Sequence, residues 1–154
     1  MDFSDLLVLF GVGYIAYLVF SQNTAYAETS TDQATGPIPP TTPTSNVVTN
    51  LANAIAQEEG FYVAGSIPQR QNNPGNLTVA GQITTYPTAA AGWSALYAQV
   101  QSMFDGTSNY YNPSMSLAQV GNIYAGGDPN WAANVASILG VSTSTTLNQL
   151  AGGS

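Results

Sequence analysis

The sequence predicts an α+β fold that is mainly α: a helical domain with one small β-hairpin, preceded by an N-terminal transmembrane helix. Three observations support this prediction. Apolar residues recur at helical spacing in several segments after residue 45. One short segment alternates about an Ala-Gly pair, as the strands of a hairpin do. An uncharged apolar run lies near the start of the chain, before a stretch rich in Pro, Thr and Ser.

The apolar run comprises residues 6–20, which contain no charged side chain. As a helix it would cover about 22 Å, which is at the lower end of what a ~30 Å hydrocarbon core requires. We therefore interpret residues 1–22 as a single-pass transmembrane anchor that contacts a lipid membrane through residues 6–20. A cleaved signal peptide is the alternative, because residues 25–27 read Ala-Tyr-Ala, although no Lys or Arg precedes the apolar run.

Residues 23–44 are interpreted as a linker, because they combine many Thr, Ser and Pro residues with almost no large aliphatic side chains. Such a segment cannot bury enough apolar area to offset the entropy that it would lose on ordering. Its Pro-Ile-Pro-Pro run favours an extended polyproline conformation. The linker would hold the following domain, residues 45–154, away from the membrane surface.

The domain begins with a predicted helix whose apolar residues recur at Val48, Leu51, Ala52, Ile55 and Ala56. A Thr-Ser pair would cap its start, and Gly60 is placed to end it. A loop rich in Gly, Pro and Asn follows. Residues 77–86 then alternate around Ala80 and Gly81, which predicts the hairpin.

The rest of the domain predicts four more helices, over residues 87–104, 116–124, 128–139 and 145–150. Asp128 and the proline after it have the pattern of an N-cap followed by Pro at the first helical position. Trp93 and Trp131 lie at helical spacing with aliphatic residues, so we expect both in the core. The elements add up to an α-rich α+β domain of about a hundred residues.

Composition restricts the chemistry that this domain can perform. The chain has no Cys and no His, which excludes the usual zinc sites, disulfides, and Ser-His or Cys-His nucleophile pairs. We therefore expect neither a metal ion nor another cofactor. Arg70 is the single cation in a chain of net charge −7, which argues against nucleic-acid binding. An acid or base would have to come from Glu, Asp or Tyr.

Helix geometry selects Glu59 over its neighbour Glu58 as the candidate acid. With Val48 at zero on a helical wheel, Glu59 lies at about +20°, in the middle of the apolar stripe, and Glu58 at about −80°, at its edge. A carboxyl on a buried face, at the negative end of a helix dipole, should have a raised pKa. A glycosidase general acid needs a Glu that keeps its proton near neutral pH. If the helix frays before Glu59, both carboxyls would instead be solvated.

Three segments of the chain read IAQEEGFYVAGSIPQRQNNPGNL, YPTAAAGWSAL and IYAGGDPNWAANV. In this order they resemble the lysozyme-like domains of bacterial and phage cell-wall lytic enzymes, which include the soluble lytic transglycosylases. Glu59 and Gly60 match the Glu and small residue at the end of the first long helix in that superfamily. Residues 73–76 are similar to an Asn-Pro-x-x-Asn element, and residues 123–126 to a Tyr-containing, Gly-terminated element. The sequence lacks the Ser that usually follows the Glu and the Gly-Leu-Met-Gln element.

The resemblance implies cleavage of peptidoglycan glycan strands, with Glu59 as the catalytic acid/base. The substrate-binding candidates are Arg70, Asn73, Asn76, Tyr86 and Tyr124. Arg70 would orient a carboxylate of the peptide stem or of Glu58, the Asn side chains would bond N-acetyl groups, and the Tyr side chains would line the sugar cleft. In the alternative interpretation, Arg70 is a surface loop residue and the Asn residues only form a turn around their Pro-Gly pair.

The number of carboxylates favours a lytic transglycosylase over a hydrolysing lysozyme. Retaining and inverting hydrolases need a second carboxylate about 5–9.5 Å from the acid. Asp128 is expected as an N-cap, Asp105 as a turn residue, and Glu58 off the catalytic face. One carboxyl suffices if Glu59 protonates the leaving oxygen and then deprotonates the C6 hydroxyl of the sugar, which yields a 1,6-anhydro product.

We therefore expect a membrane-anchored peptidoglycan lytic enzyme whose domain faces the cell wall, in the periplasm or on a virion membrane. The alternative is a non-catalytic structural or glycan-binding protein of a virion or envelope that reuses the fold. An apolar setting for Glu59 without a salt bridge would favour the enzyme. Pairing of Glu59 with Arg70, sealed from solvent, would favour the alternative.

Overall fold

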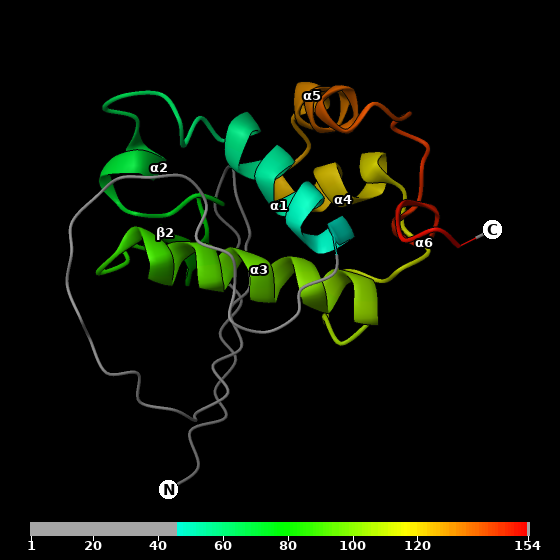
Figure 1. The fold of residues 1–154 in the computed structure, drawn as a ribbon, viewed down its shortest axis with the longest axis horizontal. Coiled ribbons are helices and arrows are strands. Elements are labelled where there is room, and N and C mark those ends of the chain that lie inside the picture. Colours follow the sequence, from blue (N-terminus) through cyan, green and yellow to red (C-terminus); the bar gives the residue numbers. More distant parts are fainter. Residues whose placement is uncertain (1–45, 154) are drawn as a thin grey trace, which may run out of the picture.

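The computed structural model describes residues 46–153, which form six helices and one two-stranded antiparallel sheet (Figure 1). In chain order the elements are α1 (Asn46–Glu58), α2 (Ile67–Arg70), β1 (Thr78–Val79), β2 (Gln82–Ile83), α3 (Ala89–Asp105), α4 (Leu117–Tyr124), α5 (Pro129–Leu139) and α6 (Leu147–Leu150). The predicted class, α+β and mainly α, is confirmed. The predicted anchor (residues 1–22) and linker (residues 23–44) lie outside the described residues. Within residues 46–153, no helix has both the length and the apolar character to span a membrane.

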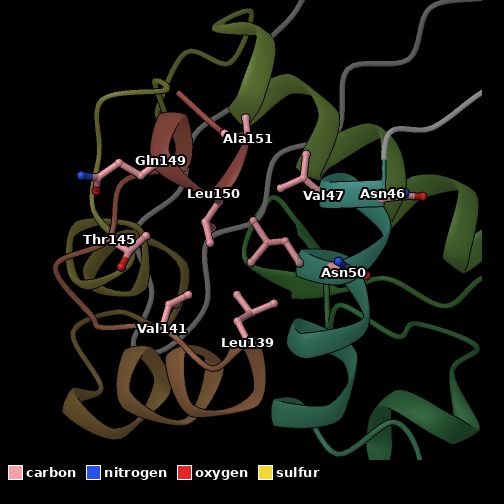
Figure 2. A pocket seen from close by; sticks show the side chains of 11 residues that line it. Asn46, Val47, Asn50, Leu139, Val141, Thr145, Gln149, Leu150 and Ala151 are labelled. Atoms are coloured by element: carbon pink, nitrogen blue, oxygen red, sulfur yellow. The ribbon is translucent and has the colours of Figure 1, made fainter. Parts of the chain in front are cut away.

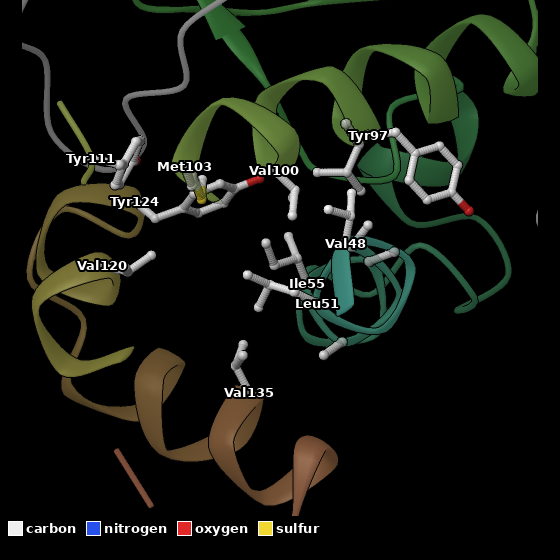
Figure 3. Close-up of a cluster of buried hydrophobic side chains, with 14 of the residues drawn as sticks. Val48, Leu51, Ile55, Tyr97, Val100, Met103, Tyr111, Val120, Tyr124 and Val135 are labelled. Carbon is white, nitrogen blue, oxygen red and sulfur yellow. The ribbon is translucent and has the colours of Figure 1, made fainter. Parts of the chain in front are cut away.

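Helix α1 forms the centre of the core, with α3 packed on one side of it and α5 on the other (Figure 1). Its residues Val48, Leu51 and Ile55 are fully buried. Figure 3 shows these side chains directed toward Val100 of α3 and Val135 of α5. Burial of one such side chain stabilises the fold by about 1.5–3 kcal/mol, so the stripe sets the rotation of α1 about its axis. That rotation decides which of the glutamates at its end faces inward.

Helix α1 ends in a Schellman-type cap. Gly60 has a left-handed backbone with φ of +77°, and the N–H of Phe61 donates back to the carbonyl of Ala56 at 2.9 Å. Glu59 is the last residue before this turn, and its N–H still donates to the carbonyl of Ile55 at 2.8 Å. The predicted stop at Gly60 is confirmed, and the backbone of Glu59 continues the helical hydrogen bonding.

The predicted hairpin is confirmed as strands β1 and β2, in which Val79 lies opposite Gln82. Ala80 and Gly81 connect the strands with φ of +51° and +76°. Two consecutive positive φ angles are what a two-residue type I′ turn requires, and this turn type matches the twist of the paired strands.

The later helices begin at the expected signals. Their N-caps are Thr88 for α3, Ser116 for α4, Asp128 for α5 and Thr146 for α6. The predicted N-cap role of Asp128 is confirmed, because its Oδ1 accepts the N–H of Asn130 at 2.9 Å. Helix α2 was not predicted and lies inside the segment interpreted as a loop. Its single turn, capped by Ser66, is too short to produce an apolar periodicity.

Candidate active site

Glu59 extends from the end of α1 toward the N-terminal part of α5. Its Oε1 accepts a hydrogen bond from the indole Nε1 of Trp131 at 2.9 Å, and its carboxyl also interacts with the side chain of Asn76. The residue is partly exposed, whereas Trp131 is buried. The carboxyl therefore has a fixed apolar wall behind it, and the residue as a whole keeps part of its surface in solvent.

Burial raises the pKa of the Glu59 carboxyl from 4.5 to about 7. Desolvation is the largest cause, because a low-dielectric surrounding disfavours the charged form. The hydrogen bonds from Trp131 and Asn76 act in the opposite direction, and the nearby carboxylates of Glu58 and Asp128 raise the pKa further. Near neutral pH the carboxyl therefore exchanges its proton readily, which suits both an acid and a base.

The wall behind Glu59 is built from two stacked rings. Tyr124 of α4 and Trp131 of α5 lie with their ring centroids 4.9 Å apart at an interplanar angle of 26°. The hydroxyl of the fully buried Tyr124 donates to the carbonyl of Gly75 at 2.6 Å. This hydrogen bond ties the ring stack to the loop that carries Asn76, so the two partners of Glu59 hold each other in place.

That loop requires a glycine at position 75. A Cβ there would lie 2.7 Å from Cδ1 of Leu96 and 2.9 Å from the hydroxyl oxygen of Tyr124. Both distances are too short for ordinary contact. A second close approach occurs at Gly92 of α3, where a Cβ would lie 1.7 Å from the carbonyl oxygen of Asn72. The loop is thus seated directly on the surface of α3.

Asn73 and Asn76, two predicted substrate-binding residues, have different positions. Asn73 is fully buried: its Nδ2 donates to the carbonyls of Leu77 and Thr84, each at 2.8 Å, and its Oδ1 accepts the N–H of Leu77 at 2.8 Å. Asn73 therefore holds the turn, as in the alternative interpretation. Asn76 has a left-handed backbone with φ of +49° and lies beside Glu59. Within residues 46–153 its buried Oδ1 has no hydrogen-bond partner.

The two predicted tyrosines lie behind the site. Tyr124 interacts electrostatically with both Glu59 and Tyr86, and burial, followed by these interactions, raises its pKa well above the usual value. Tyr86 is 9% exposed, and burial raises the pKa of its hydroxyl to about 12. Neither ring presents a free face to solvent, so these tyrosines shape the wall of the site from the interior.

Arg70 does not join this group in the described part of the chain. Its guanidinium is exposed and donates to the carbonyl of Gly65, within its own loop. Glu58, one of the two carboxylates that Arg70 was expected to orient, instead accepts a hydrogen bond from Nδ2 of Asn134 at 3.1 Å. No cation is among the groups that shift the pKa of Glu59, so Glu59 is not capped by Arg70.

The other carboxylates of the domain have local structural roles. Asp105 accepts the N–H of Thr107 at 3.0 Å, which confirms the predicted turn, and Asp128 caps α5. The negative charge of Asp128 raises the pKa of the Glu59 carboxyl. Among residues 46–153, no group of three His, Cys, Asp or Glu side chains could hold a metal ion.

Trp131 is the site residue that sequence reasoning missed. It was assigned to the core, and it is 2% exposed, but its Nε1 also contacts the candidate acid. A signal was present, because a buried indole N–H needs an acceptor. Glu59, on the buried face of another helix, was a suitable acceptor, although the sequence alone does not indicate that these two residues meet.

A separate hollow of about 630 Å³ lies at the opposite end of α1 (Figure 2). It is lined by apolar side chains that include Val47, Leu139 and Leu150, together with Asn46 and Asn50. Its lining does not include Glu59, and the thirteen residues of α1 (Asn46–Glu58) correspond to a length of about 20 Å. This hollow is therefore not part of the Glu59 site.

Comparison of the chain with family models, with curated proteins and with solved structures finds no match. What this domain can do therefore follows from the chemistry of Glu59 and its neighbours.

Proposed function

We propose that this chain cleaves the glycan strands of peptidoglycan, with Glu59 as the single acid/base of a lysozyme-like site. The observation that carries the proposal is the state of Glu59: the residue is partly exposed, its carboxyl is bonded to Trp131 Nε1 at 2.9 Å, and its pKa is raised to about 7. A carboxylic acid that keeps its proton close to neutral pH can protonate a glycosidic oxygen.

The first chemical step is general acid catalysis. Glu59 donates its proton to the glycosidic oxygen as the bond between that oxygen and C1 of the sugar breaks. The oxygen leaves with the proton, the sugar gains oxocarbenium character at C1, and Glu59 becomes a carboxylate. General acid or base participation of this kind contributes about 10²–10⁴-fold in rate.

The second step returns the proton to Glu59. The carboxylate removes the proton of the sugar's C6 hydroxyl, and the C6 oxygen forms a bond to C1. The product carries a 1,6-anhydro ring, no water is consumed, and the acid is regenerated. Asp105 forms a turn and Asp128 caps α5, and Glu58 is bonded to Asn134. The route that needs only one carboxylate is therefore favoured.

A hydrolysing lysozyme is the second candidate, and Asp128 is the residue that favours it. Its charge acts on Glu59. Asp128 also lines a hollow of about 330 Å³ together with Asn122 and Thr143, and Glu59 is not part of that lining. A carboxylate whose charge acts on the acid could activate water for an inverting reaction. The two mechanisms give different products, because hydrolysis leaves a reducing end and transglycosylation leaves an anhydro end.

A purely structural role is less well supported. Desolvation of a carboxyl lowers stability when the group ionises, and a structural site would compensate that charge with a cation. Arg70 instead donates to Gly65. As part of the proposal, residues 1–22 anchor the enzyme in a membrane of a bacterial envelope or virion, with the domain facing the cell wall.

The test is digestion of purified peptidoglycan by the full-length chain, with products identified by mass spectrometry. We expect muropeptides with 1,6-anhydro-muramyl ends, and no release by the Glu59→Gln variant. Reducing muramyl ends would replace the transglycosylase with a lysozyme. Intact peptidoglycan after incubation with folded protein across the range from about pH 4 to 8 would refute the enzymatic proposal.

A further inference from the structure

The hydrogen bond between Trp131 and Glu59 has a fixed direction. An indole Nε1–H can only donate, so the oxygen that it meets, Oε1 of Glu59, must accept. If the proton of a neutral Glu59 were on Oε1, the indole N–H would have to donate to a hydroxyl oxygen, which is a weaker acceptor than the carbonyl oxygen of the same carboxyl. This hydrogen bond therefore favours the form of neutral Glu59 that has its proton on the other oxygen, Oε2.

The indole cannot easily turn away from this position. Tyr124 stacks on one of its faces at 4.9 Å, and the hydroxyl of Tyr124 is held by the carbonyl of Gly75. The backbone of α4 also approaches closely, because a Cβ on Gly121 would lie 2.8 Å from Cε3 of Trp131. The ring therefore lies in a closely fitting slot between α4 and the end of α1, and its N–H direction is set by packing.

We propose that Trp131 is a positioning residue that keeps Oε1 of Glu59 as a permanent acceptor and so assigns the transferable proton to Oε2. The inference rests on the proposed function of Glu59, and it specifies which oxygen protonates the substrate. Because the same oxygen must later accept a proton, one atom serves both steps and the carboxyl need not rotate between them.

Other groups that act on Glu59 do not fix an oxygen in this way. Asn76 has both a donor and an acceptor in its carboxamide, so it can face either a protonated or an ionised oxygen. The charged neighbours Glu58 and Asp128 act through repulsion, and the hydroxyl of Tyr124 is already bonded to Gly75. Trp131 is the partner whose hydrogen bond has only one possible direction.

The indole resonances of the full-length, ¹⁵N-labelled protein provide a test that does not depend on activity. The chain has two tryptophans, so two indole cross-peaks are expected, and Trp93→Phe assigns them. The Trp131 cross-peak should move with a midpoint of about pH 7, and this movement should vanish in Glu59→Gln. A Trp131 cross-peak that does not titrate, or that titrates equally in Glu59→Gln, would overturn the proposal.

Activity of Trp131→Phe gives the second measurement. Phe keeps the stacked ring but lacks the donor, so kcat should fall about tenfold with little change in KM. The pH at which activity declines should move upward, because a hydrogen bond that favours the carboxylate is lost. A merely structural role would lower stability without moving the pH profile.

Trp93→Phe is the matched control. Trp93 is buried to a similar degree and packs against Phe61 and Tyr97, so its variant should leave the pH profile in place. An equal shift of the profile in Trp93→Phe and Trp131→Phe would contradict the assignment. If the Trp131 indole titrates with Glu59 but peptidoglycan is not cleaved, the proton placement is supported and the proposed function fails.

Discussion

The inner and outer sides of the end of α1 give two adjacent glutamates different surroundings. Glu59, on the inner side, is bonded to the buried Trp131. Glu58, on the outer side, is bonded to the exposed Asn134. Glu58 and Glu59 are the same residue type at adjacent positions, so the difference between their surroundings arises from the rotation of α1 about its axis. Because α1 buries its apolar face, one of two neighbouring carboxyls lies in a desolvated setting and becomes the candidate acid.

The inner side is assembled from parts that are far apart along the chain. Trp131 is 72 residues from Glu59, and Tyr124 is 49 residues from its partner Gly75. The outer side needs one contact only, between Glu58 and α5. The inner side therefore depends on the whole domain, and substitutions that disturb packing should affect Glu59 before they affect Glu58.

The largest effect should come from exchanging the two glutamates for glutamine. Glu59→Gln keeps the shape of the side chain but has no acidic proton, so kcat should fall by about 10²–10⁴-fold. Glu58→Gln, the matched control on the outer side, should retain most of the activity. The measurement is the initial rate of peptidoglycan cleavage by both variants at equal folded concentration. An inactive Glu58→Gln variant together with an active Glu59→Gln variant would show that Glu58, and not Glu59, is the acid.

Stability should also depend on pH through the inner glutamate. The folded-state pKa of Glu59 is raised from 4.5 to about 7, so the folded state binds more protons than the unfolded state between these values. The free energy of unfolding should therefore decrease as pH rises through this window, by on the order of 3 kcal/mol. Urea unfolding of wild type and Glu59→Gln at about pH 4 and pH 8 isolates the contribution of Glu59 to the pH dependence of the free energy of unfolding. Parallel pH curves for the two proteins would show that Glu59 is solvated.

A smaller effect is expected from Gly75→Ala, which disturbs the inner wall without touching Glu59. The new Cβ would lie 2.7 Å from Leu96 and 2.9 Å from Tyr124, so a core side chain must move. Overpacking of this kind costs about 1–3 kcal/mol, which thermal denaturation would detect. If stability and the pH profile are both unchanged, the stack of Tyr124 on Trp131 is not what holds Glu59.

The smallest effect should come from Asp128→Asn. Asn is as good an N-cap as Asp, so α5 should be retained, while the repulsion that raises the pKa of Glu59 is removed. We expect activity within about fivefold of wild type, as for a partly screened charge, and a small downward shift of the pH profile. A loss as large as that of Glu59→Gln would instead identify Asp128 as the base of a hydrolase.

Local signals were sufficient to predict most of the fold. The Ala80–Gly81 turn, the N-cap at Asp128 and the stop at Gly60 each depend on a few consecutive residues, and each was confirmed. The single turn of α2 was missed because four residues cannot show a helical period.

The site was only partly predictable, because its partners are distant in sequence. The wheel correctly placed Glu59 on the buried side, since the stripe of α1 lies within a few turns of it. The burial of Asn73 and the contact of Trp131 with Glu59 depend on how the 71–86 segment and α5 pack. Sequence spacing carries no information about such contacts. The indole N–H of a buried tryptophan does need a hydrogen-bond acceptor, and this need could have pointed to a polar partner for Trp131.

The pH dependence of peptidoglycan cleavage tests the central claim most directly. If Glu59 of the free enzyme must be protonated to act as the acid, kcat/KM should fall as pH rises through about 7. The fall should be absent from the residual activity of Glu59→Gln and present in Glu58→Gln. A fall centred near 4.5, the ordinary pKa of a Glu carboxyl, or one that persists in Glu59→Gln, would contradict the account.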